Sequence, residues 1–197
     1  RGGCEIGLVV AIDFTASHGA PNMPTSLHFM NPAAPNAYVQ PISTIGSILA
    51  PYDRDQMFPV YGFGARMPSG EVSHCFALNG NPANPEVAGI PGIIDAYNKA
   101  LSSVQLYGPT LFSQIIRTTS EIAAINAGAP GQRYYVLLII TDGEINDMQA
   151  TIDQVVYASN NVPISIIIVG VGNADFRPME VLDADDRALS SSAGQVA

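Results

Sequence analysis

Several segments of the chain are rich in aliphatic residues, with almost no polar interruption. The three longest are residues 6–12, 134–140 and 164–171. Such runs are typical of strands buried on both faces, as in a parallel sheet covered by helices. A shorter run at residues 57–63 predicts a fourth strand, and residues 74–78 are a candidate edge strand. The pattern therefore predicts a mainly parallel β-sheet.

Helical periodicity occupies the intervals between these runs. Apolar residues recur every three or four positions in residues 90–104 and 111–125, which predicts two amphipathic helices. Another helix is predicted after Asp147, a candidate N-cap, and a further one over residues 38–49, with Pro41 in its first turn. Strands that alternate with helices predict an α/β fold with a doubly wound, mainly parallel sheet flanked by helices.

Two segments lack periodicity. Residues 18–36 are rich in Pro, Asn and Ala and predict a long surface loop, in which His28 and Phe29 are candidates for a recognition surface. The region from Asp175 onward is acidic and then rich in serine, which predicts a solvated end. Neither segment marks a domain boundary, so we expect residues 1–197 to form a single domain.

Composition narrows the classes of partner. Hydrophobic residues make up 47% of the 197 residues, which indicates a folded protein with a substantial core. Seventeen acidic residues oppose eight basic ones, for a formal net charge of −9. This balance argues against nucleic acid as a partner and against direct binding to anionic lipid through a basic face. An acidic domain of this kind is suited to binding divalent cations.

The cysteines and the first residues of the chain indicate the cellular compartment and the extent of the protein. Cys4 and Cys75 are the only cysteines. A disulfide between them is one interpretation, but we favour two free buried thiols in a reducing compartment. No Asn-x-Ser/Thr acceptor occurs, which agrees with an intracellular site, and no apolar run approaches the length of a membrane span. The chain lacks an initiator Met and enters a core strand at once, so we expect it to be part of a longer protein.

Oxygen-bearing side chains gather where the predicted strands end. Asp13, Thr15 and Ser17 follow the first strand, Thr110 follows a Gly-Pro pair, and Asp142 follows the strand at residues 134–140. Ligands of such sheets bind beyond the carboxyl ends of the strands, which is the edge where both aspartates fall. The five residues are therefore candidate ligands of one divalent cation.

The donor types indicate which cation. A hard cation such as Mg²⁺ prefers six oxygen ligands at about 2.0–2.1 Å. Two carboxylates roughly neutralise its charge, and hydroxyls add oxygen without charge, which leaves a coordination position for an acidic group of a partner. The absence of soft ligands disfavours zinc and copper. We predict Mg²⁺ or Mn²⁺, with Ca²⁺ as the alternative.

Simpler structural interpretations stay open for each residue. Asp13 can cap a following helix, Thr15 and Ser17 can form turns with their own backbone, and Thr110 can be an N-cap. Asp142 can belong to a plain Asp-Gly turn. The pattern alone does not choose between these roles and a metal site.

A Mg²⁺-dependent phosphotransferase is an alternative from another functional class. The chain has no P-loop motif, and its two Gly-x-Gly pairs lack the third glycine of a dinucleotide-binding loop. No His or Cys occupies the site motifs, and His18, a candidate base, lies in the predicted loop. We therefore predict no catalytic residue and no enzymatic activity.

At these residues the chain resembles a von Willebrand factor A domain, which is Rossmann-like, and more closely the A domain of a copine. The metal motif alone suggests only the broad class, whereas the blocks at residues 58–65 and 106–110 are far more specific. The resemblance covers almost the whole chain and also includes residues 12–17, 26–28, 89–97, 138–145, 163–172, 175–176 and 179–183.

The resemblance implies a metal-ion-dependent adhesion site (MIDAS), whose roles fall on Asp13, Thr15, Ser17, Thr110 and Asp142. Thr15 stands where integrin-type A domains carry Ser, and this exchange of one hydroxyl for another should preserve the site. The implied partners are target proteins that offer an acidic residue to the metal.

Copines also have two N-terminal C2 domains that bind phospholipid when calcium rises, and neither is present here. The resemblance thus implies the interaction domain of an adaptor that recruits target proteins to membranes in trafficking and signalling. We expect it in the cytoplasm, peripheral at the plasma membrane when calcium rises, with phospholipid bound only through the C2 domains. The family's chain continues into another strand-like segment, so we expect an incomplete C-terminal edge.

Two related classes share the motif. One is the A domain of a copine-like RING ubiquitin ligase, and the other is an extracellular adhesion domain of integrin type. The use of cysteine and the lack of glycosylation acceptors argue against the second.

Overall fold

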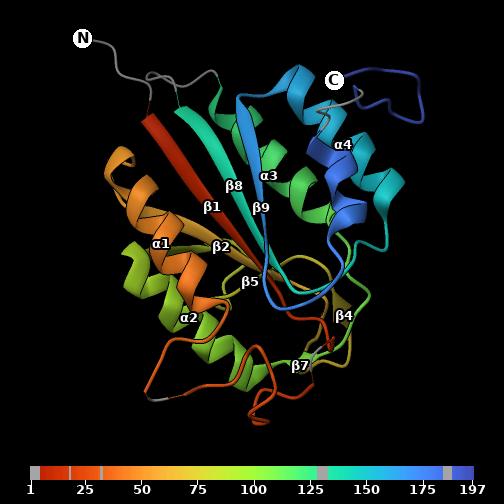
Figure 1. Ribbon diagram of the computed structural model, residues 1–197. Helices are drawn as coiled ribbons and strands as arrows, with labels where there is room; N and C mark the ends of the chain where they lie inside the picture. Colours follow the sequence, from red (N-terminus) through yellow and green to blue (C-terminus); the bar gives the residue numbers. More distant parts are fainter. Residues whose placement is uncertain (1–4, 18, 32, 128–132, 184–187) are drawn as a thin grey trace.

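The sheet is built around its first strand. Figure 1 shows the computed structural model, which describes residues 5–17, 19–31, 33–127, 133–183 and 188–197. The strand order is β5-β2-β1-β8-β9, in which the last four run parallel, while β5 and β6 pair antiparallel with β2. The strands are β1 (Glu5–Asp13), β2 (Met57–Phe63), β5 (Phe76–Ala77), β6 (Glu86–Ala88), β8 (Arg133–Thr141) and β9 (Ile164–Gly170).

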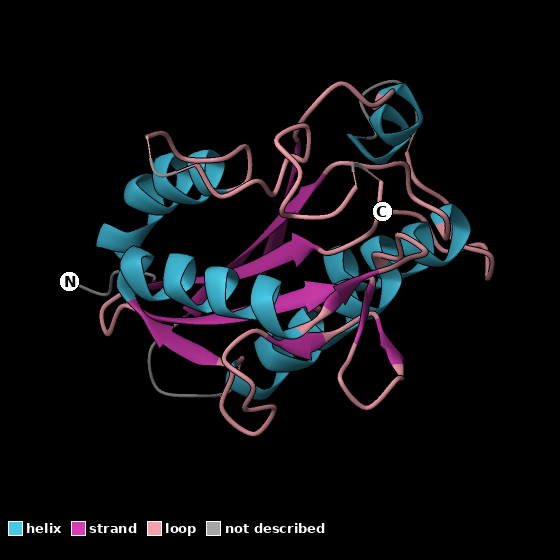
Figure 2. Cartoon of the chain, turned by 90° about the horizontal axis from the view of Figure 1, so that it is seen from below, coloured by secondary structure: helices cyan, strands magenta, loops and turns pink. Residues whose placement is uncertain are grey.

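Helices cover both faces of the sheet, as Figure 2 shows from below. Figure 1 shows α1 and α2 on one face and α3 and α4 on the other. In β1, Leu8, Val10 and Ile12 belong to the core beneath the first pair, and Val9 and Ala11 to the core beneath the second. Burial on both faces explains why the strand is apolar almost throughout. The helices are α1 (Val39–Leu49), α2 (Gly89–Ser103), α3 (Ser113–Asn126) and α4 (Met148–Asn161).

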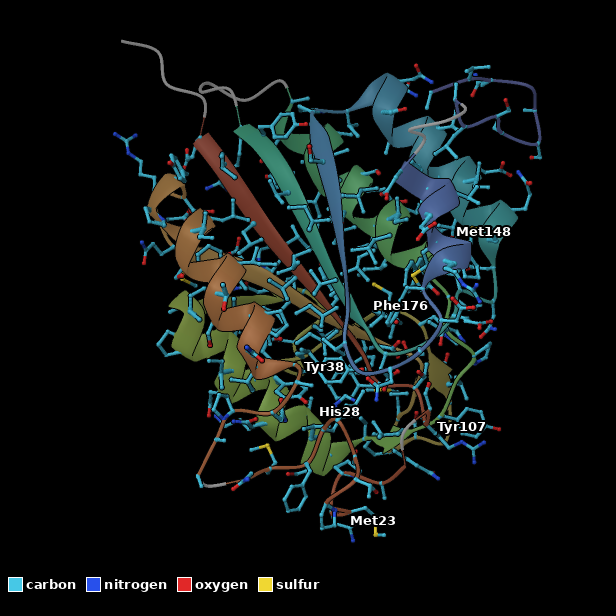
Figure 3. All side chains as sticks on the ribbon, viewed as in Figure 1. Met23, His28, Tyr38, Tyr107, Met148 and Phe176 are labelled. Carbon is cyan, nitrogen blue, oxygen red and sulfur yellow. The ribbon has the colours of Figure 1, made fainter. Side chains whose placement is uncertain are left out.

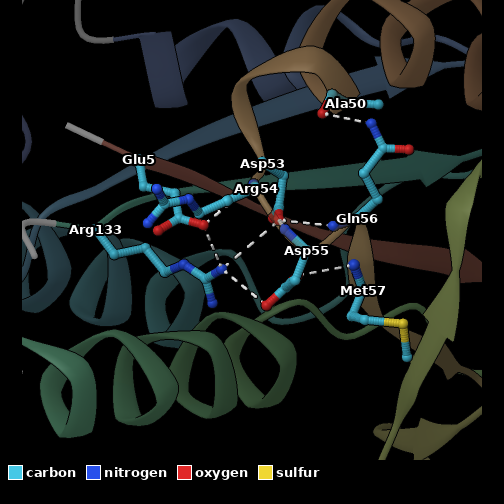
Figure 4. Close-up of polar contacts among 8 residues, drawn as sticks. All are labelled: Glu5, Ala50, Asp53, Arg54, Asp55, Gln56, Met57 and Arg133. Carbon is cyan, nitrogen blue, oxygen red and sulfur yellow. Dashed lines mark hydrogen bonds and ion pairs between the residues drawn. The ribbon is translucent and has the colours of Figure 1, made fainter. Parts of the chain in front are cut away.

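At the amino end of the sheet, acidic side chains surround one arginine (Figure 4). Arg133, the register partner of Glu5, places its Nη2 3.0 Å from the Glu5 carboxylate, 3.3 Å from that of Asp55 and 3.6 Å from that of Asp53. Asp53 is buried, and its Oδ1 also accepts the backbone N–H groups of Asp55 and Gln56. The chain thus supplies the counter-charge of this cluster itself.

At the carboxyl end, a small antiparallel sheet adjoins the main one. Its order is β4-β3-β7, with β3 (Ala65–Arg66), β4 (Val72–Ser73) and β7 (Gln105–Leu106). Gly64 alone separates β2 from β3, with φ of +77°. A Cβ at Gly64 would lie 2.3 Å from Cγ2 of Thr15, so only glycine lets this turn approach the segment after β1.

The predicted elements agree closely with the structure. The four long strands match to within one residue at each end, the four helices are present, and Pro41 lies in the first turn of α1. The candidate edge strand at residues 74–78 is reduced to the two residues of β5. The short 3-10 helices are η1 (Ala50–Tyr52) and η2 (Arg177–Asp183).

The prediction of a solvated end after Asp175 is wrong in part. This region contains η2, and the side chains of Met179 and Leu189 are buried. Cys75 is a free thiol as expected, but it is only half-buried and donates a hydrogen bond to Thr118; Cys4 lies outside the described residues. No helix in the described ranges has the length and apolar character needed to cross a membrane.

Candidate metal centre

The carboxylate of Asp13 is fixed where β1 ends. Its side chain is fully buried, and its Oδ1 accepts the backbone N–H of Thr15 at 2.8 Å. Its Oδ2 accepts the hydroxyl of Thr141, the last residue of β8, at 2.5 Å. Because both donors come from the ends of adjacent parallel strands, the sheet itself orients the carboxylate.

Three hydroxyls extend from this carboxylate toward solvent. The Thr15 and Ser17 hydroxyl oxygens lie 3.0 Å apart, and the Thr110 hydroxyl donates to that of Thr15 at 3.4 Å. Thr15 and Thr110 are buried, whereas Ser17 is exposed. The hydroxyls therefore form a continuous row of oxygen atoms from the interior to the surface.

Asp142 and Gly143 bring the third loop to the same point. Asp142 follows β8 and is buried. A Cβ at Gly143 would lie 3.2 Å from the Ser17 hydroxyl oxygen and 3.4 Å from that of Thr110, so the backbone here packs directly against both hydroxyls. The structure thus places all five candidate ligands at one edge of the sheet.

The two carboxylates disfavour each other's charge. Burial, followed by the nearby charge of Asp142, raises the pKa of Asp13 to about 6, although the hydrogen bonds from Thr141 and Thr15 act in the opposite direction. No lysine or arginine in the described part of the chain forms an ion pair with Asp13. A bound cation would relieve this repulsion.

The donor set fits a hard divalent cation. It comprises two carboxylates and three hydroxyls and contains no nitrogen or sulfur ligand. Oxygen ligands of this kind suit Mg²⁺ or Mn²⁺. Within the described ranges, no group of three or more His, Cys, Asp or Glu side chains could hold a metal ion. A site here therefore depends on its hydroxyl oxygens.

Comparison with known proteins identifies the family. The sequence model of the copines, described as "Copine", matches residues 26–197. The chain belongs to the copine family. This copine chain is 51% identical over 197 residues to Protein BONZAI 1 and to Protein BONZAI 2, both of Arabidopsis thaliana. The matches cover 99% of the chain but 34% and 33% of those proteins, so the chain spans about a third of their length.

A solved structure with a similar fold is the manganese-loaded TRAP protein of Plasmodium vivax. The TM-score is 0.59 at 12% identity, over 95% of the copine chain and 65% of the other. At this identity the likeness concerns the fold alone. The predicted α/β fold of von Willebrand factor A type and the copine resemblance are thus confirmed.

The prediction that His28 contributes to a recognition surface is wrong. His28 is only 1% exposed and stacks on the ring of Tyr38, with centroids 4.1 Å apart, while its Nδ1 lies 2.8 Å from the Tyr97 hydroxyl. Phe29 is half-buried. Figure 3 shows His28 and Tyr38 near the carboxyl end of β1.

Sequence reasoning missed two supports of this copine site. Thr141 lies in the same block as Asp142 and could have been found there, since its hydroxyl is at the strand end. Tyr38 carries no local signal, because it lies 25 residues after Asp13 in the sequence. Burial, followed by the charges of Asp13 and Asp142, raises the pKa of the Tyr38 phenol.

The loop after Asp142 also holds the Thr110 loop in place. The Thr110 N–H donates to the Asn146 side chain at 2.8 Å, and the Asn146 N–H donates to the Thr110 carbonyl at 2.9 Å. Asp147 was expected to cap α4. Its carboxylate instead accepts the backbone N–H groups of Phe112 and Ser113 at the start of α3, as well as the Thr151 hydroxyl in α4.

Proposed function

We propose that this copine domain binds acidic segments of partner proteins through a divalent cation held at the candidate metal centre. Asp13 and Asp142 would supply the two charged ligands, and Thr15, Ser17 and Thr110 the neutral ones. The proposal is for binding without turnover.

One observation carries this proposal. Two buried aspartates lie close enough for the charge of one to raise the pKa of the other, at the end of a row of three hydroxyls. Burying like charges together is costly unless a cation compensates them. In a domain of net charge −9, an acidic partner would otherwise be repelled.

Each side chain has a distinct part in this function. Thr141 and the Thr15 N–H hold the Asp13 carboxylate in one orientation. The exposed Ser17 marks the side from which a partner approaches. When bound, the cation supplies a positive charge and an open coordination position that a partner carboxylate can fill.

Membership of the copine family supports a proposal for the cellular role. The domain would recruit target proteins in the cytoplasm, while C2 domains of a longer protein would bind the plasma membrane when calcium rises. Membrane phospholipid is therefore not proposed as a ligand of residues 1–197.

Calorimetric titration of Mg²⁺, Mn²⁺ and Ca²⁺ into the chain tests the proposal. We expect one cation to bind per chain and Asp13→Ala to weaken that binding about 100-fold or more, because a buried charged ligand is lost. Asp95→Ala removes an exposed carboxylate on α2 that pairs with Lys99, and it should leave the affinity unchanged.

Equal metal affinity in the wild type and in Asp13→Ala would contradict the site. If the folded wild type binds no cation alone, the titration is repeated with an acidic peptide present, since the partner can supply the missing ligand. Failure to bind in both conditions would contradict the proposed function.

A further inference from the structure

A stacked arginine and tyrosine lie beside the candidate metal centre. The Arg66 guanidinium carbon is 4.1 Å from the centroid of the Tyr107 ring, within the range of a cation–π contact. Tyr107 is 46% exposed, and Figure 3 shows it at the outer edge of the carboxyl end. The pair, here called the Arg66–Tyr107 pair, therefore combines a half-buried cation with an exposed aromatic surface.

Backbone contacts tie this pair to the proposed ligands. Tyr107 forms a parallel bridge with Thr15, its carbonyl accepts the N–H of Ala16, and it precedes Thr110 by three residues. Arg66 lies two residues after Gly64, whose backbone packs against the Thr15 methyl group. Both residues thus belong to segments that touch Thr15.

Arg66 differs from most of the other basic residues in the described ranges, because those residues pair with a carboxylate. Lys99, Arg117, Arg133 and Arg177 each have a carboxylate within 2.6 to 3.8 Å. Arg54 lies at the opposite end of β1, where its backbone N–H donates to Glu5. Arg66 has no ion pair within the described ranges, and its buried Nε makes no hydrogen bond there.

This arrangement suits recognition of a carboxylate. A guanidinium that stacks on an aromatic ring keeps N–H donors at its edges, and these match the two oxygens of a carboxylate. The ring also fixes the long side chain, which lowers the entropy lost on binding. Exposed Glu144 follows β8 and Arg66 follows β2, and these two strands flank β1 on opposite sides. The charges on the two sides of β1 therefore differ in sign. This difference favours one orientation of a bound acidic segment.

We propose that the Arg66–Tyr107 pair is a second contact point for the partner, so that the domain prefers peptides with two acidic residues. One carboxylate binds at the metal centre, the other binds Arg66, and an apolar group of the peptide packs on Tyr107. This inference rests on the proposed function and specifies the partner of the same site.

Binding of synthetic peptides to the chain, in saturating Mn²⁺, tests this preference. The peptides carry one acidic residue or two, with the spacing between the two varied. We expect the best diacidic peptide to bind about fivefold more tightly than the monoacidic one, the usual scale for a partly exposed charge-assisted contact. Arg66→Gln should abolish this difference and leave binding of the monoacidic peptide unchanged.

Two further variants separate recognition from folding. Arg66→Lys keeps the charge but loses the stacked fork, and it should retain only part of the preference. Arg117→Gln removes the same charge from α3, where Arg117 pairs with Glu121, and should retain the full preference. Thermal unfolding of each variant shows whether its fold is intact.

The outcomes distinguish this inference from the proposed function. If Mn²⁺ binds and the monoacidic peptide binds, but Arg66→Gln keeps the diacidic preference, the inference alone is overturned. If Mn²⁺ fails to bind even with peptide present, the proposed function fails first. A titration with vesicles of anionic phospholipid serves as the third arm; vesicle binding that needs Arg66, without any peptide preference, would overturn the inference in favour of a lipid phosphate.

Discussion

The two ends of β1 both bury aspartate, but they compensate its charge differently. At the amino end, Arg133 contacts three carboxylates and is itself the cross-strand partner of Glu5. At the carboxyl end, Asp13 accepts hydrogen bonds from neutral donors, and the nearest charge that shifts its pKa is another carboxylate, Asp142. Within the described residues, one end thus has a counter-charge from the chain itself, whereas at the other end we propose that an external cation supplies it.

The causes of the pKa shifts, and not their size, reflect this difference. Burial raises the pKa of Asp53 to about 6 at the amino end, as it does that of Asp13, but there the charge of Arg133 opposes the rise. Hydrogen bonds, from Arg133 to Glu5 and from the Met57 N–H to Asp55, lower the pKa of both neighbouring carboxyls. The same strands thus carry an ion-paired cluster at one end and the proposed metal site at the other, and three predictions test that difference.

The largest effect concerns the charge of Asp13. Its pKa rises from the ordinary 3.8 to about 6 in the folded state, so ionisation at neutral pH costs the metal-free native state about 3 kcal/mol. This cost is present above pH 6 and disappears as the pH falls below the unfolded value. Asp13→Asn should therefore stabilise the metal-free domain at pH 7 and lose that advantage at lower pH.

Denaturant unfolding of both proteins over a pH series, with a chelator present, measures this difference. Asp53 titrates in both proteins, so only the difference between them is interpreted. In saturating Mn²⁺ the order should reverse, because the metal stabilises only the protein that binds it. If the gain in the free energy of unfolding of Asp13→Asn does not vary with pH, the charge of Asp13 is not the cause, and the proposed difference between the two ends is wrong.

The next effect concerns the amino end. Arg133→Met keeps the apolar stem but leaves buried Asp53 without its counter-charge, and it should lower the free energy of unfolding by about 2 kcal/mol, less than for a fully buried pair because Arg133 is partly exposed. Metal affinity should not change. Arg117→Met, at an exposed pair on α3, should lie within about 0.5 kcal/mol of wild type.

Denaturant unfolding and calorimetry report the two quantities separately. If Arg133→Met weakened metal binding as strongly as a change at Asp13, the two ends would be coupled and the division between them would be wrong.

Local sequence patterns predicted the sheet and the candidate ligands because both depend on strands. Residues buried on both faces leave an apolar run, as in β1 and β8, and parallel strands bring their carboxyl ends to one edge. Asp13 and Asp142 follow directly from that rule, although it predicts where they lie and not that they bind a metal.

Contacts between distant short segments could not be predicted in this way. Arg66 and Tyr107 lie on or beside strands of two residues, which have no periodicity to detect. His28 has a polar side chain in a loop rich in Pro and Asn, yet stacking on Tyr38 and a contact with the Tyr97 hydroxyl bury it. Asp147 caps a helix that begins 34 residues earlier, a partner that no local motif reveals.

The smallest effect separates oxygen donation from packing at Thr15. Its hydroxyl lies 3.0 Å from that of Ser17, and its methyl group packs against Gly64. Thr15→Ser removes only the methyl group, so it should cost about 0.8 kcal/mol of stability and leave Mn²⁺ affinity within about twofold. Thr15→Val keeps the shape and removes the oxygen, so it should weaken Mn²⁺ binding about tenfold with little change in the fold.

Calorimetry with Mn²⁺ on these two variants decides whether the charge of the two carboxylates alone accounts for metal binding at the carboxyl end. If Thr15→Val binds Mn²⁺ as tightly as wild type, the two carboxylates suffice and the row of hydroxyls is structural. If only Thr15→Val is impaired, the carboxyl end differs from the amino end in its oxygen donors as well as in its missing counter-charge. A cation would then be selected there by hard neutral ligands, which an arginine cluster such as that of Arg133 does not offer.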